Sequence, residues 1–350
     1  MKERILRAID FVRTYAVPRP AGSRQEAATA EAILRELREA AETAEKVTAG
    51  SAKEAASELS AGNAAGTTEG AGAKGGGVRI WKETFSFRSE RFDGWAADGR
   101  LPRGGEDGYA SFDGTRFREP IRSCNVAALI PGTDAEAEKE NATGLLSFSA
   151  HFDSVPGSPG AYDNLAANAI LLNLFRHYLA HRSRRPLLFL FCGAEEPGLC
   201  GSRAFVIRHG RELERDLFHC NIDLSGQEGG TDVLGVTAEP EVCGVLSDLL
   251  GRRGFPVETK NQIWSSDSNS FAEAGIPSLT LDRDGIGMHT AEDTADRIRE
   301  DVIVYQTELI RTITDALDHA EPLPFPETVP QAMREELRHQ FQSGETEIFV

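Results

Sequence analysis

Residues 145–164 read LLSFSAHFDSVPGSPGAYDN, and this stretch carries the two patterns that decide the architecture. A mostly apolar run of strand length, 145–151, is followed by Gly- and Pro-rich text, and a helical pattern covers 164–179. His151, Asp153 and Asp163 stand where the strand ends and in the loop after it. Ligands bind at the carboxyl ends of strands in open α/β sheets. This loop is therefore the first candidate for a functional site.

Similar apolar runs lie on both sides of this stretch and alternate with helical patterns. We expect further strands at 78–87, 125–130, 187–192, 220–224 and 278–282, and further helices at 197–209, 239–250 and 298–313. Short apolar strands that alternate with helices are typical of parallel sheets that are buried on both faces. The sequence therefore predicts an α/β fold, with a mixed, mostly parallel central sheet and helices on both faces.

The 350 residues are long enough for one large domain, and we expect it to span 1–320. A helix should begin at Ser23, with Glu26 completing a capping box. From about 42 to 77 the text is rich in Ala, Gly, Glu, Ser and Thr and has few large apolar residues. Such a segment buries too little surface to offset its ordering entropy, so we predict a flexible insertion with a fragile helix near 52–59. We expect 321–350 to be a peripheral tail.

Charge and composition exclude several classes of protein. The formal charge of −17 argues against a nucleic-acid partner, because phosphate binding needs clustered Lys and Arg. No apolar run approaches the length of a membrane span, and the charged N-terminus does not resemble a signal peptide. The cysteines are scattered, odd in number and without a CxxC motif, at positions 124, 192, 200, 220 and 243. We therefore expect free thiols and a cytoplasmic protein without a membrane partner.

Three further groups of residues extend the candidate site. Glu195 and Glu196 follow strand 187–192, Asp223 closes strand 220–224, and His289 follows strand 278–282. Each has an ordinary explanation when taken alone, such as a helix cap or an acidic first turn. Carboxylates at the ends of buried strands are nevertheless costly without a compensating charge. Together with His151 and Asp163, these residues predict a divalent metal site.

The order of these motifs resembles peptidase family M28, the co-catalytic zinc aminopeptidases and their relatives. The similar pieces are His151-Phe-Asp153-Ser, Gly160-Ala-Tyr-Asp163-Asn164, Gly193-Ala-Glu195-Glu196-Pro-Gly-Leu-Cys-Gly201-Ser202, Asn221-Ile-Asp223, Ser266-Asp267, 271–277 and His289-Thr-Ala-Glu-Asp293. Upstream, 19–23 and 125–132 are also similar to the family. The resemblance covers roughly 1–40 and 78–318, and it implies a zinc-exopeptidase fold of the phosphorylase/hydrolase-like type.

The resemblance also implies roles for individual residues. Two zinc ions would be bridged by Asp163, one held also by His151 and Asp223 and the other by Glu196 and His289. Cobalt or manganese could substitute for zinc in such a donor set. Two residues would serve catalysis directly: Glu195 as the general base toward the attacking water and the leaving amine, and Asp153 as the group that orients the His151 ring.

The sequence departs from the family's usual text in three places. The common Asp-Asn-x-Ser-Gly is here Asp163-Asn-Leu-Ala166-Ala167, a small-for-small change. Met288 replaces the Tyr that many members carry before the last His, so an oxyanion would need another donor or the metals. The common Ser-Asp-His is here Ser266-Asp267-Ser268, where Asp267 is expected either to line the substrate pocket or to lie in a surface loop.

Three functions are compatible with these motifs. The leading prediction is a zinc exopeptidase, specifically an aminopeptidase that acts on peptides with an activated water. A glutaminyl-cyclase-like enzyme with one zinc is the second, and the retention of His151 beside the other four ligands counts against it. A non-catalytic binding module on the same fold is the third, although it would have little use for a spare carboxylate at Glu195.

Overall fold

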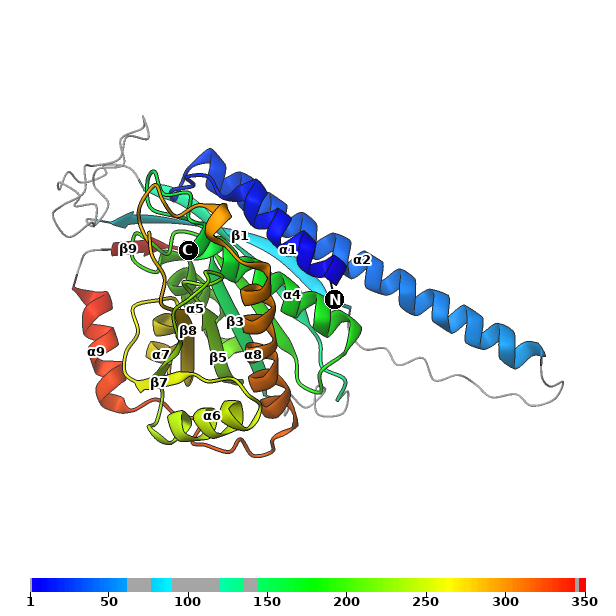
Figure 1. Cartoon of the computed structure of the whole chain (residues 1–350). Coiled ribbons are helices and arrows are strands. Elements are labelled where there is room, and N and C mark those ends of the chain that lie inside the picture. Colours follow the sequence, from blue (N-terminus) through cyan, green and yellow to red (C-terminus); the bar gives the residue numbers. More distant parts are fainter. Residues whose placement is uncertain (1, 62–76, 90–119, 135–143, 344–345) are drawn as a thin grey trace.

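The centre of the molecule is one mixed sheet, with strand order β7-β6-β8-β5-β3-β4-β2-β1-β9 (Figure 1). The structure, a computed structural model, describes residues 2–61, 77–89, 120–134, 144–343 and 346–350. The strands are β1 Arg79–Ser89, β2 Ile121–Ile130, β3 Leu145–His151, β4 Leu187–Cys192, β5 Asp216–Ile222, β6 Asp232–Thr237, β7 Glu258–Asn261, β8 Ser278–Arg283 and β9 Thr346–Phe349. The neighbours β4, β3, β5 and β8 are parallel, and antiparallel pairs flank them.

Helices cover both faces of the sheet, which confirms the predicted α/β class (Figure 1). The helices are α1 Lys2–Tyr15, α2 Arg24–Ala61, α4 Ala166–Ala180, α5 Cys200–Leu213, α6 Glu241–Arg252, α7 Ser268–Ala274, α8 Glu300–His319 and α9 Gln331–Gln342, with short helical turns η1 Ala161–Leu165 and η2 Ala295–Arg297. One face packs against α1, α2, α4, α6 and α8. The other packs against α5 and α7, and α9 lies against α7.

The alternation of side chains along β4 shows how one apolar run serves both cores. Leu187, Phe189 and Phe191 join the core beneath α4 and α8, whereas Leu188 and Leu190 join the core beneath α5 and α7. All five are nearly or fully buried. Successive side chains on a strand point to opposite faces, so a continuous apolar run is what a doubly covered strand requires.

Helix α2 differs from the prediction for the N-terminal insertion. The helix begins next to Ser23, whose Oγ accepts the Glu26 N–H at 3.0 Å, and it continues to Ala61. Residues 42–61 are therefore helical rather than a flexible segment, and Figure 1 shows this half of α2 projecting beyond the other helices. Its Ala-, Glu- and Lys-rich text has high intrinsic helix propensity, although it offers little apolar surface. Residues 62–76 of the predicted insertion lie outside the described residues.

The C-terminal residues, predicted to be a peripheral tail, contribute a helix and a strand. Leu337 of α9 is fully buried against Ala272 of α7 and Val329. Strand β9 pairs with the end of β1, with Phe349 opposite Ser86. The tail is therefore part of the folded unit, at the edge of the sheet. Strands β6, β7 and β9 were not among the predicted strands.

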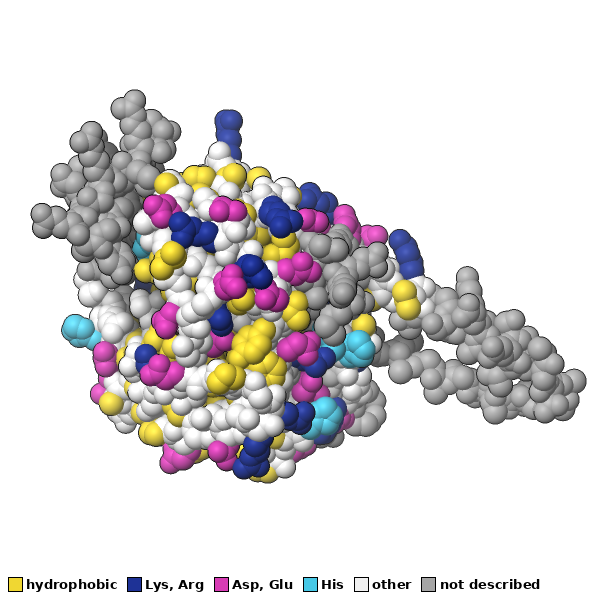
Figure 2. Space-filling view, viewed as in Figure 1, with side chains coloured by type: hydrophobic (Ala, Val, Ile, Leu, Met, Phe, Trp, Pro, Cys, Tyr) yellow, Lys and Arg dark blue, Asp and Glu magenta, His cyan; other side chains and the backbone are white. Residues whose placement is uncertain are grey.

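The described surface carries charged side chains of both signs. Figure 2 shows Lys and Arg side chains interspersed with Asp and Glu on the displayed face. No described helix is long and apolar enough to cross a membrane. All five cysteines lie in the described ranges and are free thiols, as predicted.

Candidate metal centre

The predicted ligands come from the carboxyl ends of adjacent strands. His151 is the last residue of β3, Glu196 lies in the turn after β4, and Asp223 follows β5. Asp163 lies in η1, and His289 in the loop after β8. Because β3, β4, β5 and β8 run parallel, their carboxyl ends meet at one edge of the sheet, which brings together residues as distant in sequence as 151 and 289.

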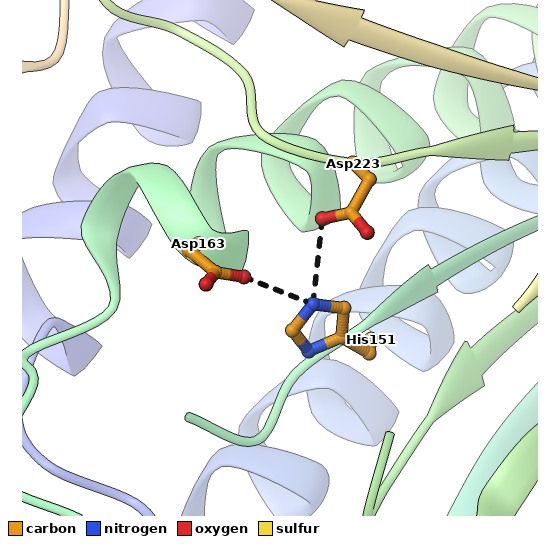
Figure 3. Close-up of side chains that lie close together, drawn as sticks. All are labelled: His151, Asp163 and Asp223. Carbon is orange, nitrogen blue, oxygen red and sulfur yellow. Dashed lines mark ion pairs between the residues drawn. The ribbon is translucent and has the colours of Figure 1, made fainter. Parts of the chain in front are cut away.

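His151, Asp163 and Asp223 form the first cluster (Figure 3). The Nε2 atom of His151 lies 3.1 Å from Asp163 Oδ1 and 3.4 Å from Asp223 Oδ1. One potential ligand atom from each residue lies within 4.8 Å of the other two. The three side chains are almost entirely buried. One imidazole nitrogen and two carboxylates thus face a common point from three separate elements.

Asp163, Glu196 and His289 form the second cluster, and Asp163 belongs to both. The Nε2 atom of His289 lies 3.0 Å from Asp163 Oδ2 and 3.1 Å from Glu196 Oε2. Asp163 therefore turns one oxygen toward His151 and the other toward His289. One carboxylate is therefore shared by the two clusters.

Burial and mutual charge shift the pKa values in opposite directions across the two clusters. Burial, with the nearby charge of Asp163, raises the pKa of Glu196 to about 7. Burial also raises the pKa of Glu195 well above its ordinary value. Burial acts to raise the pKa of Asp163 as well, but hydrogen bonds from His151 and His289 outweigh it and leave that pKa lowered. Positive charge beside acids packed this closely would stabilise their ionised forms.

Asp153 touches both the histidine and the glutamate pair. Its Oδ1 lies 3.4 Å from His151 Nδ1, on the side of the ring opposite the first cluster. The same oxygen accepts the Glu195 N–H at 2.9 Å, and Oδ2 accepts the Glu196 N–H at 3.2 Å. Asp153 thus contacts the ring of one candidate ligand and fixes by hydrogen bonds the backbone of another, Glu196, and of Glu195 before it. The prediction from the resemblance covered only the ring.

Two supporting residues were not assigned roles from sequence. Asp293, fully buried, accepts the N–H groups of Tyr162 at 2.6 Å and Asp163 at 3.0 Å, and so fixes the backbone of the shared ligand. Arg19, also fully buried, donates to the carbonyls of Phe152, Pro159 and Gly160. Their positions in Arg19-Pro-Ala-Gly-Ser23 and His289-Thr-Ala-Glu-Asp293 were the available signals.

Asp223 is oriented through a chain of polar side chains. Ser266 Oγ donates to Asp223 Oδ2 at 2.6 Å and accepts from the Asn221 amide at 2.7 Å. Asn221 in turn accepts from Ser149 Oγ at 2.6 Å, and Ser149 contacts His219 Nε2 at 2.9 Å. Each member is buried and has a partner, so the chain fixes the Asp223 carboxylate.

A cleft opens over the two clusters. Its wall includes Glu195, Met288 and Trp264, together with Phe341 and Thr346 from the C-terminal residues. Met288 thus borders the cleft, but a thioether donates no hydrogen bond. The tail that we predicted to be peripheral also forms part of this wall.

Asp267 does not take either of its predicted positions. The side chain is fully buried, so it is neither in a surface loop nor in the wall of the cleft. Its neighbours Ser265 and Asn269 line the cleft instead. The cause is the packing of α7 against α5, which covers the start of α7.

Non-glycine residues with left-handed backbones surround the centre. Ala194 has φ of 52°, Leu199 57°, Leu224 44° and His289 59°. Such conformations cost about 1–3 kcal/mol each, and they persist where the surroundings enforce them. Ala194 and Leu224 adjoin Glu195 and Asp223, so the strained positions coincide with the residues that carry the chemistry.

The donor set fits zinc. Imidazole nitrogens and carboxylate oxygens without thiolate suit a co-catalytic zinc pair, and cobalt or manganese accept the same donors. His151 Nε2 and His289 Nε2 both point at carboxylates rather than at backbone carbonyls. Cations at these positions would be ligated by the ring nitrogens and would neutralise the carboxylates.

The family comparison agrees with this geometry. The family model for Peptidase family M28 matches residues 125–314, more than half of the chain and all five candidate ligands. The chain belongs to peptidase family M28. Among curated relatives, Aminopeptidase YwaD of Bacillus subtilis (strain 168) is 30% identical over 146 residues, which are 41% of this chain and 29% of that protein. Vacuolar membrane protease of Lachancea thermotolerans is 33% identical over 135 residues, 39% and 13% of the two chains.

Solved structures of other proteins show the same fold. The zinc aminopeptidase BSAP from Bacillus subtilis matches with a TM-score of 0.64 at 17% identity, over 94% of this chain and 98% of that chain. A glutaminyl cyclase from an Acidobacteriales bacterium matches with a TM-score of 0.59 at 16% identity, over 89% and 93%. The chain spans less than a third of the length of the curated relatives named above.

Proposed function

We propose that this M28 chain is a zinc-dependent aminopeptidase, which removes residues from the N-termini of peptides. The observation that carries the proposal is the position of Asp163, whose two oxygens face His151 and His289 separately. One carboxylate shared between two clusters favours a pair of metal ions over a single ion. Membership of a peptidase family supports a peptide as the substrate.

The proposed ligands divide into two sets that share one residue. His151, Asp163 and Asp223 would hold one zinc ion, and Asp163, Glu196 and His289 the other. Zinc ions bound in this way supply an activated water and a Lewis acid for the scissile carbonyl. Asp153 and Asp293 keep the ligands in position through the contacts described above.

Glu195 is the proposed general base and acid. Its Oε2 lies 4.0 Å from His151 Nε2, so it borders the centre, although it belongs to neither cluster. From this position the carboxylate would take a proton from the attacking water and return it to the leaving amine. Proton transfer by a positioned side chain contributes about 10²–10⁴-fold to a rate.

The charge of the cleft favours a substrate with a free amino terminus. Asp282 lines the cleft beside the centre and accepts the Trp264 indole N–H at 2.9 Å. Burial raises the pKa of Asp282 to about 7, with a further contribution from Asp223. A substrate ammonium group near these acids would gain a favourable interaction, which supports action on peptide N-termini.

The test combines a zinc titration with a hydrolysis assay. The metal-stripped protein should bind two equivalents of zinc, and the loaded protein should hydrolyse aminoacyl-p-nitroanilides. His151→Ala should reduce the count toward one, while His181→Ala, which changes an exposed histidine outside the cleft, should leave it at two.

Other outcomes would support the alternative functions. Saturation at one zinc in the parent, with cyclisation of an N-terminal Gln peptide, would replace the proposal with a cyclase. Two bound zinc ions without turnover of any aminoacyl substrate would indicate a binding module.

A further inference from the structure

Two polar side chains on the cleft wall, Arg203 and Asn269, keep hydrogen-bonding capacity that the metal centre does not use. Arg203 lies in the first turn of α5, and Asn269 near the start of α7. Both line the same cleft as the two clusters. Neither was identified from the sequence as a site residue.

The two residues lie at the interface between α5 and α7. Their chain neighbours Ser202 and Ser270 form a hydrogen bond between α5 and α7, with 2.7 Å between the hydroxyl oxygens. This bond joins α5 and α7 at the residues next to Arg203 and Asn269 in the chain. Both side chains are therefore supported by packed helices rather than by mobile loops.

The Arg203 side chain is held by Phe341 and forms no ion pair among the described residues, although the nearby charge of Glu273 acts to raise its pKa. Its guanidinium stacks over the Phe341 ring at 4.6 Å, and Nη2 donates to the Phe341 carbonyl at 3.4 Å. Within the described residues, no carboxylate lies within 4 Å of it, and Nε and Nη1 make no hydrogen bond. Burial lowers the pKa of Arg203. A half-buried cation of this kind is stabilised when an anion reaches it.

Asn269 offers a second set of hydrogen-bonding groups. The residue is 3% exposed, and its Oδ1 is buried without a partner among the described residues. Its Nδ2 likewise donates to no group in the described part of the chain. The Nδ2 group is not among the fully buried atoms, so it can donate to an acceptor on a ligand in the cleft.

Backbone hydrogen bonds connect Arg203 to Glu195. Glu195 O accepts the Leu199 N–H at 2.6 Å, and Leu199 O accepts the Arg203 N–H at 3.0 Å. The cleft therefore has an acidic side at the metal ligands and Asp282, and a cationic group at Arg203.

We propose that Arg203 and Asn269 form a carboxylate-binding subsite, which anchors the end of the substrate away from the scissile bond. The inference rests on the proposed aminopeptidase function and specifies its substrates as short peptides that carry a carboxylate. The guanidinium would form charge-assisted hydrogen bonds through Nε and Nη1, and Asn269 Nδ2 would donate one more. The carboxylate is either the C-terminus of a di- or tripeptide or an acidic side chain.

Four substrates separate the two sources of the carboxylate. Leu-Gly carries a C-terminal carboxylate, Leu-Gly-amide carries none, and Leu-Glu-amide carries one on a side chain. Leu-p-nitroanilide is the reference without a carboxylate. In Arg203→Gln, kcat/KM should fall roughly tenfold or more for the preferred carboxylate substrate, through KM, and change little for the amide and the anilide. Arg203→Lys should restore part of the preference.

Two further variants guard against a purely structural effect. Arg211→Gln removes an exposed charge from the same helix, outside the cleft, and should leave every substrate unchanged. Asn269→Asp keeps the shape of the side chain but places a negative charge in the subsite, so it should also abolish the preference. Melting temperatures of all variants identify any loss of folding.

Equal losses of kcat/KM for all four substrates would show that Arg203 only packs against Phe341 and binds no carboxylate. Unchanged KM values in Arg203→Gln would also contradict the subsite. A parent that hydrolyses none of the four would instead refute the proposed function. Calorimetry with Leu-Gly and Leu-Gly-amide then still tests the subsite: the parent should bind the acid more tightly, and Arg203→Gln should not.

Discussion

Asp153 is one buried side chain that contacts both a candidate metal ligand and the proposed general base. It contacts the back of the His151 ring, and its two oxygens separately hold the N–H groups of Glu195 and Glu196. The two glutamates are adjacent in sequence but have different surroundings. Glu196 meets His289 and accepts the Val155 N–H at 3.1 Å, whereas Glu195 borders the first cluster.

This difference predicts distinct losses for the two glutamates. Glu195→Gln keeps size and hydrogen bonding but cannot accept a proton, so kcat should fall about 10²–10⁴-fold while two zinc ions remain bound. Glu196→Gln should lose affinity for one zinc ion specifically. Paired zinc titrations and peptidase kinetics measure both effects. Near-parent turnover by Glu195→Gln, or loss of a zinc from that variant alone, would contradict the assignment.

Glu26 predicts a pH dependence of stability. It accepts the Gly22 N–H at 2.6 Å and contacts Ser123 Oγ at 2.5 Å, and burial raises its pKa from 4.5 to about 8. The folded chain therefore holds a proton that the unfolded chain releases above pH 4.5. The stabilisation is complete below pH 4.5 and is lost as the pH rises toward 8.

Glu26→Gln should remove this dependence, because an amide does not titrate. Relative to the variant, the parent should lose up to about 1.4 kcal/mol of unfolding free energy per pH unit between pH 5 and 8. Denaturant unfolding at several pH values measures the difference. Parallel pH profiles for the two proteins would show that Glu26 does not titrate in this range.

The local sequence pattern could identify site residues that lie at the end of a single strand. His151 and Asp223 lie at strand ends, so an apolar run followed by a polar residue is a sufficient signal. Asp293 acts on a backbone 130 residues earlier, and no local pattern indicates that contact. The burial of Asp267 depends on the packing of α7 against α5, which is equally invisible in the local text.

Among the elements, the central strands were predictable and the edges were not. Strands β3, β4 and β5 are buried on both faces and consist largely of apolar residues. Strand β7, by contrast, reads ETKN and lies at the edge of the sheet, where its side chains are exposed or only partly buried. Helix α2 is longer than predicted because 42–61 has high helix propensity, although it has little apolar surface to bury.

The projecting half of α2 predicts tolerance of deletion. Ala40 still packs against the core, and Lys82 of β1 forms an ion pair with Glu31 of α2, so the chain returns beside the part of the helix that it left. Replacing 42–76 with a short Gly/Ser linker should leave the melting temperature and the peptidase activity nearly unchanged, because closing a surface loop costs little entropy. A large loss of either would show that the segment packs on the body or covers the cleft.

The clustered acids of the candidate metal centre predict that zinc stabilises the fold. The five candidate ligands come from separate elements, and their carboxylates repel one another without a cation. Zinc at 100 times its dissociation constant should add about 2.7 kcal/mol per site to the unfolding free energy. Scanning calorimetry should show a lower melting temperature after chelation and recovery with zinc. Equal melting temperatures with and without zinc would contradict metal binding by the folded state.

Strand β9 has a consequence for how the protein is made. During translation the ribosome supplies the five candidate ligands well before residues 346–349, which pair with Ser86–Ser89 of β1. Until the chain reaches these residues, this edge of β1 has no partner strand from the same chain. Until β9 is added, that open edge is a site where two nascent chains could pair with each other. Completion of the cleft wall and protection of the edge would then be the same late event.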